Sequence, residues 1–307
     1  MTRAALCFPG QGSQAAGMAA GLLDQPLAVS LLDTAAGEGL DLGAALQGSD
    51  DQLRPTQLAQ PALLLVELVL AAAIPAGVDV VGVAGHSVGE YAAVSVAGAY
   101  SAEDAMRLVI RRGREMAAMT EGTMAAVLGL DAAAVEDACA EARGCGEVVV
   151  IGNLNAPGQV VISGSVSGVE RAAALARARG ARRITALNVS GAFHSPLMGP
   201  AAERFAAVVT TTPRAALRFP VVSNVDAVAV GDSEGLPGRL AMQLESPVRW
   251  VDCITRLVGL GAEVLVEVGP GAVLSGLNRR IAPQVRTASV NDLASASALA
   301  TLWTAPA

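Results

Sequence analysis

Residues 78–89 read Val78-Asp79-Val80-Val81-Gly82-Val83-Ala84-Gly85-His86-Ser87-Val88-Gly89, and this stretch predicts a buried strand followed by a sharp turn. The apolar run is typical of a strand in an α/β core, and we expect a helix from about residue 88 to 97. Gly-x-Ser-x-Gly between a strand and a helix is the pattern of a nucleophile elbow, which exposes a serine hydroxyl at the end of a sheet. Ser87 is therefore a candidate nucleophile, although a structural turn with an unreactive serine also fits the pentapeptide alone.

The histidines narrow the choice of a base for this serine. The chain has 2 histidines, His86 and His194, and a serine nucleophile needs a base. His86 adjoins the serine, so we expect its side chain to point away from the hydroxyl and to be hydrogen-bonded. His194 lies in a Gly/Ser/Pro-rich segment from which a triad histidine could reach a nucleophile. No obvious third acid follows, so the sequence favours a Ser–His dyad in which a neutral group orients the imidazole.

Backbone amides near the elbow could stabilise a developing oxyanion. The Val88 amide lies at the N-terminus of the expected helix and could donate to it. A second donor could come from Pro9-Gly10-Gln11-Gly12, which follows a short strand predicted at residues 4–8, because glycines allow close approach of the backbone. Arg111-Arg112-Gly113-Arg114 is either a solvated basic face or the source of one inward-turned arginine that binds a carboxylate.

Composition excludes several function classes. Among the 307 residues all 21 basic side chains are arginine, so a Schiff-base lysine, a pyridoxal phosphate anchor and a P-loop lysine are excluded. A net charge of -7 argues against nucleic-acid binding. The 4 cysteines are scattered without paired spacing, so we expect no metal site. We also expect no cofactor, no membrane span and no signal peptide, and hence a cytoplasmic protein.

The order of expected elements indicates an insertion in a larger α/β unit. Residues 123–188 predict the order βαββαβ of a ferredoxin-like module, inserted into a domain made of 1–122 and 189–307. Within the module we expect an Asn-Leu-Asn-Ala-Pro-Gly turn after a strand at 147–151, and a capping box from Ser167 to Glu170.

Outside the module, three further features are expected. Gln60-Pro61 should open a helix, because proline is tolerated at an early helical position. Strands are expected at 219–224 and 263–268. Gly269-Pro270-Gly271 should lead into a last helix.

Taken together, the motifs resemble the malonyl-CoA:acyl carrier protein transacylases of fatty acid synthesis. The resemblance covers nearly the whole chain in the same order. Its motifs are Phe8-Pro9-Gly10-Gln11-Gly12-Ser13-Gln14, Gln60-Pro61-Ala62-Leu63-Leu64, Gly85-His86-Ser87-Val88-Gly89-Glu90-Tyr91, Arg112-Gly113, Asn153-Leu154-Asn155-Ala156-Pro157-Gly158-Gln159, Gly191-Ala192-Phe193-His194-Ser195, Asn224-Val225, Gln243 with Pro247-Val248-Arg249-Trp250, and Glu267-Val268-Gly269-Pro270-Gly271.

The resemblance implies an α/β-hydrolase-like large domain with a parallel sheet, a ferredoxin-like insert and a specific set of roles. Ser87 would attack the thioester of malonyl-CoA with His194 as base, and the oxyanion would lie between the Gln11 and Val88 amides. Gln243 would orient the histidine through its main-chain carbonyl, and Arg112 would pair with the malonyl carboxylate. The remaining substrate-binding residues implied are Phe193, Met116, His86 and Asn155.

The implied reaction passes the malonyl group from Ser87 to the phosphopantetheine thiol of acyl carrier protein, and we expect a monomer. Phe193 should crowd an α-methyl branch and favour malonyl. Gly-Ala-Phe-His favours fatty acid synthesis over a polyketide synthase, although a discrete polyketide acyltransferase and a serine thioesterase or hydrolase stay open. A non-catalytic scaffold is the third class. Docking of an acidic carrier protein needs a basic patch, for which the candidates are Arg177, Arg179, Arg182, Arg183, Arg279 and Arg280.

Overall fold

A computed structural model describes residues 2–299 and shows an α/β fold with two separate sheets. The larger sheet has six strands in the order β10-β9-β1-β2-β7-β8. All its pairs are parallel except β7 with β8. Its strands are β1 (Arg3–Phe8), β2 (Asp79–Gly85), β7 (Val221–Val222), β8 (Ala229–Val230), β9 (Val264–Val268) and β10 (Arg286–Val290). The α/β class predicted from the sequence is confirmed.

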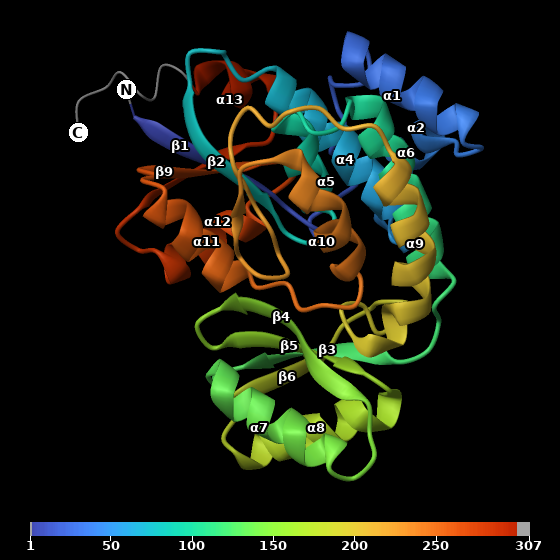
Figure 1. Cartoon of the computed structure of the whole chain (residues 1–307), viewed down its shortest axis with the longest axis vertical. Helices are drawn as coiled ribbons and strands as arrows, with labels where there is room; N and C mark the ends of the chain where they lie inside the picture. Colours follow the sequence, from blue (N-terminus) through green and yellow to red (C-terminus); the bar gives the residue numbers. More distant parts are fainter. Residues whose placement is uncertain (1, 300–307) are drawn as a thin grey trace.

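Helices cover both faces of this sheet (Figure 1). Successive side chains of β1 alternate between the faces, because residues 4, 6 and 8 join one apolar cluster and residues 5 and 7 join the other. The helices of this part are α1 (Pro26–Gly37), α2 (Leu42–Leu46), α3 (Asp50–Leu53), α4 (Thr56–Ala72), α5 (Gly89–Val96), α6 (Ala102–Ala117), α9 (Gly199–Thr211), α10 (Leu236–Met242), α11 (Trp250–Gly259), α12 (Val273–Ile281) and α13 (Leu293–Ala298), with short 3₁₀ turns η1 (Pro196–Met198) and η2 (Ser233–Gly235).

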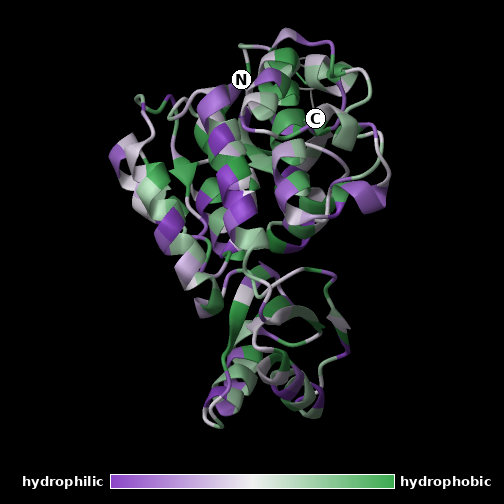
Figure 2. Cartoon of the chain, turned by 90° about the vertical axis from the view of Figure 1, so that its right-hand side faces the viewer, coloured by the Kyte–Doolittle hydropathy of each residue, from purple (hydrophilic) through white to green (hydrophobic). Residues whose placement is uncertain are grey.

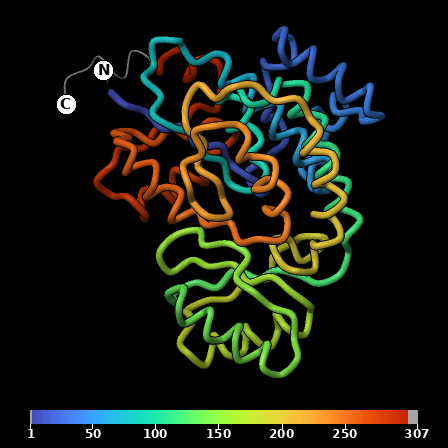
Figure 3. The backbone as a smooth tube through the Cα atoms, in the orientation of Figure 1, coloured from blue at the N-terminus to red at the C-terminus, as the bar shows by residue number. Residues whose placement is uncertain are grey.

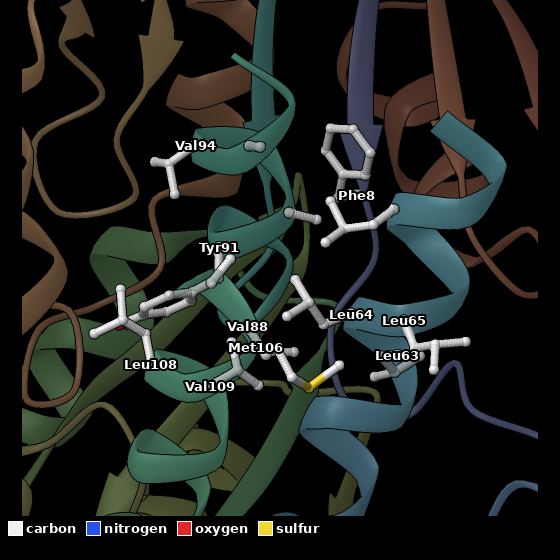
Figure 4. Close-up of a cluster of buried hydrophobic side chains, with 14 of the residues drawn as sticks. Phe8, Leu63, Leu64, Leu65, Val88, Tyr91, Val94, Met106, Leu108 and Val109 are labelled. Carbon is white, nitrogen blue, oxygen red and sulfur yellow. The ribbon is translucent and has the colours of Figure 1, made fainter. Parts of the chain in front are cut away.

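The larger apolar cluster packs behind the serine turn. Phe8 at the end of β1, Leu64 on α4 and Val88 at the start of α5 all belong to it (Figure 4). Surface helices turn hydrophilic residues outward and hydrophobic ones inward (Figure 2). Because this burial holds β1, α4 and α5 against one another, the segments that carry Gln11 and Ser87 have fixed relative positions.

The second sheet has four antiparallel strands in the order β4-β5-β3-β6. Its elements follow the chain as β3 (Thr123–Leu128), α7 (Ala132–Arg143), β4 (Val149–Ala156), β5 (Gln159–Gly164), α8 (Val166–Ala178) and β6 (Arg183–Ala186). The backbone enters this part after α6 and returns to the larger part before α9 (Figure 3). The predicted βαββαβ order is therefore observed.

Two local predictions about helix starts are wrong. Helix α4 begins at Thr56, with Pro55 at its N-cap, so Pro61 lies inside the helix and removes one backbone hydrogen bond there. The N-cap of α8 is Ser165, whose hydroxyl accepts from the Gly168 amide, whereas Ser167 bonds Glu147. In both cases the helix begins earlier in the chain than the motif predicts.

Two predictions about chain course also need correction. Strand β4 continues through Asn153 and Asn155, because Asn153 pairs with Val161 and Leu154 donates to the Val248 carbonyl. The turn predicted there shrinks to Pro157-Gly158. Helix α12 is not the last element, since β10 and α13 follow it.

Candidate active site

Ser87 sits in a strained turn between β2 and α5. Its φ of 53° is in the left-handed region that side chains with a Cβ avoid. Asn224 stabilises the turn, because its Oδ1 accepts from the Ser87 amide at 2.8 Å and its Nδ2 donates to the Gly85 carbonyl at 2.7 Å. The turn presents the Ser87 hydroxyl to a cavity rather than to the core.

The glycines of the turn are required by close backbone contacts. A Cβ on Gly89 would lie 2.2 Å from the Phe8 carbonyl oxygen, and a Cβ on Gly85 would lie 1.9 Å from the Gly89 carbonyl carbon. Neither contact can be relieved by a side-chain rotation, because the opposing atoms belong to the backbone. The tight approach of α5 to β1 thus depends on glycine.

We expect Gly89→Ala to lower the free energy of unfolding by about 3 kcal/mol or more, since the added methyl forces β1 and α5 apart. Chemical denaturation monitored by circular dichroism measures the change. Gly77→Ala is the matched control, because its Cβ would meet nothing within 4 Å, and it should stay within about 0.5 kcal/mol of the wild type. Equal stability of the two variants would contradict this account of the turn.

His194 faces the serine from the loop before α9. Its Nε2 lies 2.8 Å from Ser87 Oγ, and its Nδ1 lies 2.8 Å from the Gln243 carbonyl oxygen and 3.2 Å from that of Ser246. Since carbonyl oxygens only accept, they hold the ring proton on Nδ1 and leave Nε2 to accept from the serine hydroxyl. Burial, with a smaller effect of the Arg112 charge, lowers the pKa of His194 to about 3. The imidazole is therefore neutral and able to take a proton.

Arg112 brings a buried positive charge to the serine. The side chain is 1% exposed, with Nη2 3.0 Å from Ser87 Oγ and 3.0 Å from Gln243 Oε1, and Nη1 2.6 Å from Gln60 Oε1. Burial lowers its pKa. Within residues 2–299 no ion pair involves Arg112, and its Nε has no hydrogen-bond partner. Among the described residues the hydrogen-bond partners of this buried cation are all neutral, so it is suited to receive an anionic ligand.

Two main-chain amides are available beside the serine. In the part of the chain that the structure describes, neither the Gln11 nor the Val88 amide donates to a protein acceptor. Both residues line the same cavity as Ser87. The Val88 amide lies at the start of α5 and the Gln11 amide lies in a glycine-containing loop, which is the arrangement of an oxyanion-binding pair.

The cavity collects nearly all residues predicted for the site. It has a volume of about 150 Å³. Gln243 is absent from its lining and acts through His194 and Arg112. The predicted residues in the lining are Gln11, His86, Ser87, Val88, Arg112, Met116, Asn155, Phe193 and His194.

His86 adopts the orientation expected from the sequence. Its Nε2 bonds Asn155 Oδ1 at 2.8 Å, and its ring meets Trp250 edge to face with centroids 5.6 Å apart. The imidazole therefore points away from Ser87 Oγ.

Four polar residues of the site were not predicted from the sequence. Thr56 Oγ1 donates to Gln11 Oε1 at 2.8 Å and accepts from Gln60 Nε2 at 2.8 Å, so a relay of side chains links Gln11 to Arg112. Glu90 and Asn224 contact the other side of the turn. Gln60, Glu90 and Asn224 stand in quoted motifs, which could have marked them, whereas no pattern singles out Thr56.

The candidate docking arginines lie away from this cavity and are all exposed. Arg280 is partly engaged, since it donates to Gln159 Oε1 at 2.6 Å and to the Pro157 carbonyl at 2.5 Å. Arg179 pairs with Glu141 at 2.7 Å. In residues 2–299 no helix is long and apolar enough to cross a membrane. No cluster of three or more His, Cys, Asp or Glu side chains that could hold a metal ion occurs in that range.

The fold and the serine–histidine–arginine cavity define the class of the protein. Residues 6–301 match the family model described as the acyl transferase domain, and the chain belongs to that family. It is 40% identical over 299 residues to the malonyl CoA-acyl carrier protein transacylase of Bacillus subtilis, covering 95% of this chain and 94% of that protein.

Solved structures give the same result. The malonyl CoA-acyl carrier protein transacylase of Coxiella burnetii superposes with a TM-score of 0.91 at 37% identity, covering 98% of this chain and 97% of that one. A malonyl-transacylase solved in complex with its type II PKS acyl-carrier protein has a TM-score of 0.89 at 37% identity, covering 97% and 98%. The family resemblance seen in the sequence is confirmed.

Proposed function

We propose that the chain transfers a malonyl group from malonyl-CoA to the phosphopantetheine thiol of acyl carrier protein through a malonyl-Ser87 intermediate. The observation that carries this proposal is the buried Arg112 guanidinium, which lies 3.0 Å from Ser87 Oγ and forms no ion pair with any carboxylate of residues 2–299. An acyl group that ends in a carboxylate supplies the missing anion. The names of the relatives, which specify malonyl and acyl carrier protein, support the same substrates.

In the first half-reaction Ser87 Oγ attacks the thioester carbonyl of malonyl-CoA. His194 Nε2 takes the hydroxyl proton as the new C–O bond forms, and the Gln11 and Val88 amides stabilise the oxyanion. When the C–S bond breaks, the imidazolium returns the proton to the thiolate and CoA leaves as a thiol. The Gln243 carbonyl holds Nδ1–H throughout, so no acidic third residue is needed.

In the second half-reaction the phosphopantetheine thiol of the carrier protein replaces CoA. His194 accepts the thiol proton while the sulfur attacks the malonyl ester, and the proton then passes to Ser87 Oγ as the ester bond breaks. The same two amides stabilise the second oxyanion. The result is a ping-pong exchange that uses no cofactor.

Several side chains set the acyl specificity in this proposal. Phe193 lines the cavity, where its ring would crowd an α-methyl branch of the acyl group. Met116, His86 and Asn155 complete the substrate-binding lining.

We further propose that residues 1–122 and 189–307 form an α/β-hydrolase-like catalytic domain with an inserted ferredoxin-like domain at 123–188. Residues 1 and 300–307 of these bounds lie outside the described residues. The parallel strands around β1 and β2 support the first part. The antiparallel order β4-β5-β3-β6, with α7 and α8 packed on one cluster, supports the second. The cavity has residues from both, with Ser87 on one side and Asn155 on the other.

Brief incubation with malonyl-CoA followed by intact-mass measurement tests the function. We expect a single malonyl adduct on the wild type that disappears on adding phosphopantetheinylated carrier protein, because the acyl-serine is an intermediate. Ser87→Ala should form no adduct. An equal adduct on Ser87→Ala, or none on the wild type, would refute covalent catalysis, and rapid release of free malonate without a carrier would favour a hydrolase.

A carrier protein of a polyketide synthase is the second candidate acceptor. The similarity of the chain to a malonyl-transacylase solved with its type II PKS acyl-carrier protein supports this second acceptor. Comparing rates with one fatty-acid and one polyketide carrier, at equal concentration and with the same malonyl-CoA, separates the two acceptors.

A further inference from the structure

The side-chain amide of Gln243 connects the main parts of the site. It is fully buried, with Oε1 accepting from Arg112 Nη2 at 3.0 Å and Nε2 donating to the Ser87 carbonyl at 2.9 Å. The same Nε2 donates to Glu90 Oε2. Since the two ends of an amide have opposite hydrogen-bonding character, a reversed amide would place an NH₂ group against the Arg112 guanidinium. The orientation of this one amide therefore decides whether Arg112 Nη2 has an amide acceptor besides Ser87 Oγ.

Glu90 lies where it can fix that orientation. It is in the first turn of α5, three residues after Ser87, and is 1% exposed. The groups that hydrogen-bond to its carboxylate are all donors: Gln243 Nε2, the main-chain amide of Asn224 at 3.3 Å from each oxygen, and the Ser223 hydroxyl. A carboxylate accepts on both oxygens, whereas an amide in its place offers one acceptor and one donor.

We propose that Glu90 is a positioning residue that holds the Gln243 amide with its oxygen toward Arg112, and so keeps the guanidinium in place for the carboxylate of the acyl group. The proposal rests on the malonyl transfer proposed above and adds a residue that governs its specificity. Glu90 does not line the catalytic cavity, so it acts through Gln243.

The surroundings of Glu90 make this role sensitive to pH. The charged and titratable groups that interact with it are Arg112 on α6, Tyr91 on α5 and Cys253 on α11. Burial raises the pKa of Glu90 to about 7, although the hydrogen bonds and the Arg112 charge oppose the shift. The accepting carboxylate is thus present above about pH 7 and is lost as the pH falls through that value. His194 does not titrate in this range, because its pKa is lowered to about 3.

The test compares Glu90→Gln with the wild type on malonyl-CoA and acetyl-CoA. In the variant, the glutamine places an NH₂ group against the donors that converge on position 90. We expect the Gln243 amide to turn over, because this relieves the contact between donors. We expect the malonyl-to-acetyl ratio of kcat/KM to fall by about tenfold, the difference between a charge-assisted and a neutral hydrogen bond. Glu203→Gln, at an exposed position of α9, is the matched control and should leave the ratio unchanged. A purely structural role would lower both substrates equally, so an unchanged ratio overturns the proposal.

The pH dependence of the ratio is the second measurement and needs only the wild type. Between pH 8 and 6 we expect the malonyl-to-acetyl ratio to fall with a midpoint near the pKa of about 7, and to stay flat in Glu90→Gln. Both substrates carry the same CoA, so titration of its phosphates cancels. A flat wild-type ratio overturns the proposal even if the variant does not fold. Absence of a malonyl adduct on wild-type Ser87 would instead refute the function, so the two failures are distinct.

Discussion

Arg112→Ala is expected to lower kcat/KM for malonyl-CoA by about a hundredfold to a few thousandfold and to retain or increase transfer of acetyl. The guanidinium is the cation proposed to pair with the malonyl carboxylate in a buried cavity. Leaving a buried charge without its partner costs roughly 3–5 kcal/mol, which corresponds to this loss. Acetyl has no carboxylate, so it gains room and loses no ion pair. Steady-state rates with both thioesters measure the change.

Arg111→Ala is the matched control for this variant. Arg111 is the preceding residue on α6, but its side chain is 46% exposed and pairs with Glu115. Arg111 does not line the cavity and Glu115 keeps its second ion pair, with Arg204, so this variant should keep the malonyl preference of the wild type. Equal losses for malonyl and acetyl in Arg112→Ala would contradict the assignment of the arginine to the acyl carboxylate.

The central residues of the site could be predicted because the elbow motif is contiguous in sequence and the chain has few histidines to choose from. The strand, the glycines and the serine of the elbow are contiguous in sequence, and the close backbone contacts at Gly85 and Gly89 explain why glycines flank the serine. His194 followed from the presence of 2 histidines in the chain, one of them adjacent to the serine. The structure brings His194 to 2.8 Å from Ser87 Oγ.

The supporting contacts could not be predicted in the same way, since they depend on how distant segments pack. Thr56 enters the relay to Arg112 only because α4 begins at residue 56, before the proline that was expected to open the helix. Asn155 reaches His86 because β4 continues through the predicted turn, where the strand backbone hydrogen-bonds to the backbone of Val248. The first difference comes from an earlier helix start, with Pro55 at the N-cap, and the second from a tertiary contact with Val248 that overrides the local asparagine signal.

His194→Asn is expected to lower kcat by about ten-thousandfold to a millionfold, the range found when a member of a catalytic serine site is removed. Asparagine suits this position because it tolerates a left-handed backbone, and the φ of His194 is 59°. Its side-chain NH₂ can replace Nδ1–H as donor to the Gln243 carbonyl, so the fold should survive. An amide has no basic nitrogen, however, and cannot take the proton from Ser87.

The pH profile of the wild type completes this prediction. The pKa of His194 is lowered from its usual 6.5 to about 3 by burial and the Arg112 charge. The neutral base is therefore present above the folded-state pKa and is lost only as the pH falls through about 3. Acetyl transfer, which does not use the ion pair with Arg112, should keep its kcat/KM from pH 8 down to about pH 5, within the limits of stability. A fall in kcat/KM for acetyl with a midpoint between about pH 6 and 7 would contradict a neutral His194 as the general base. So would a kcat of His194→Asn above about a tenth of the wild-type value.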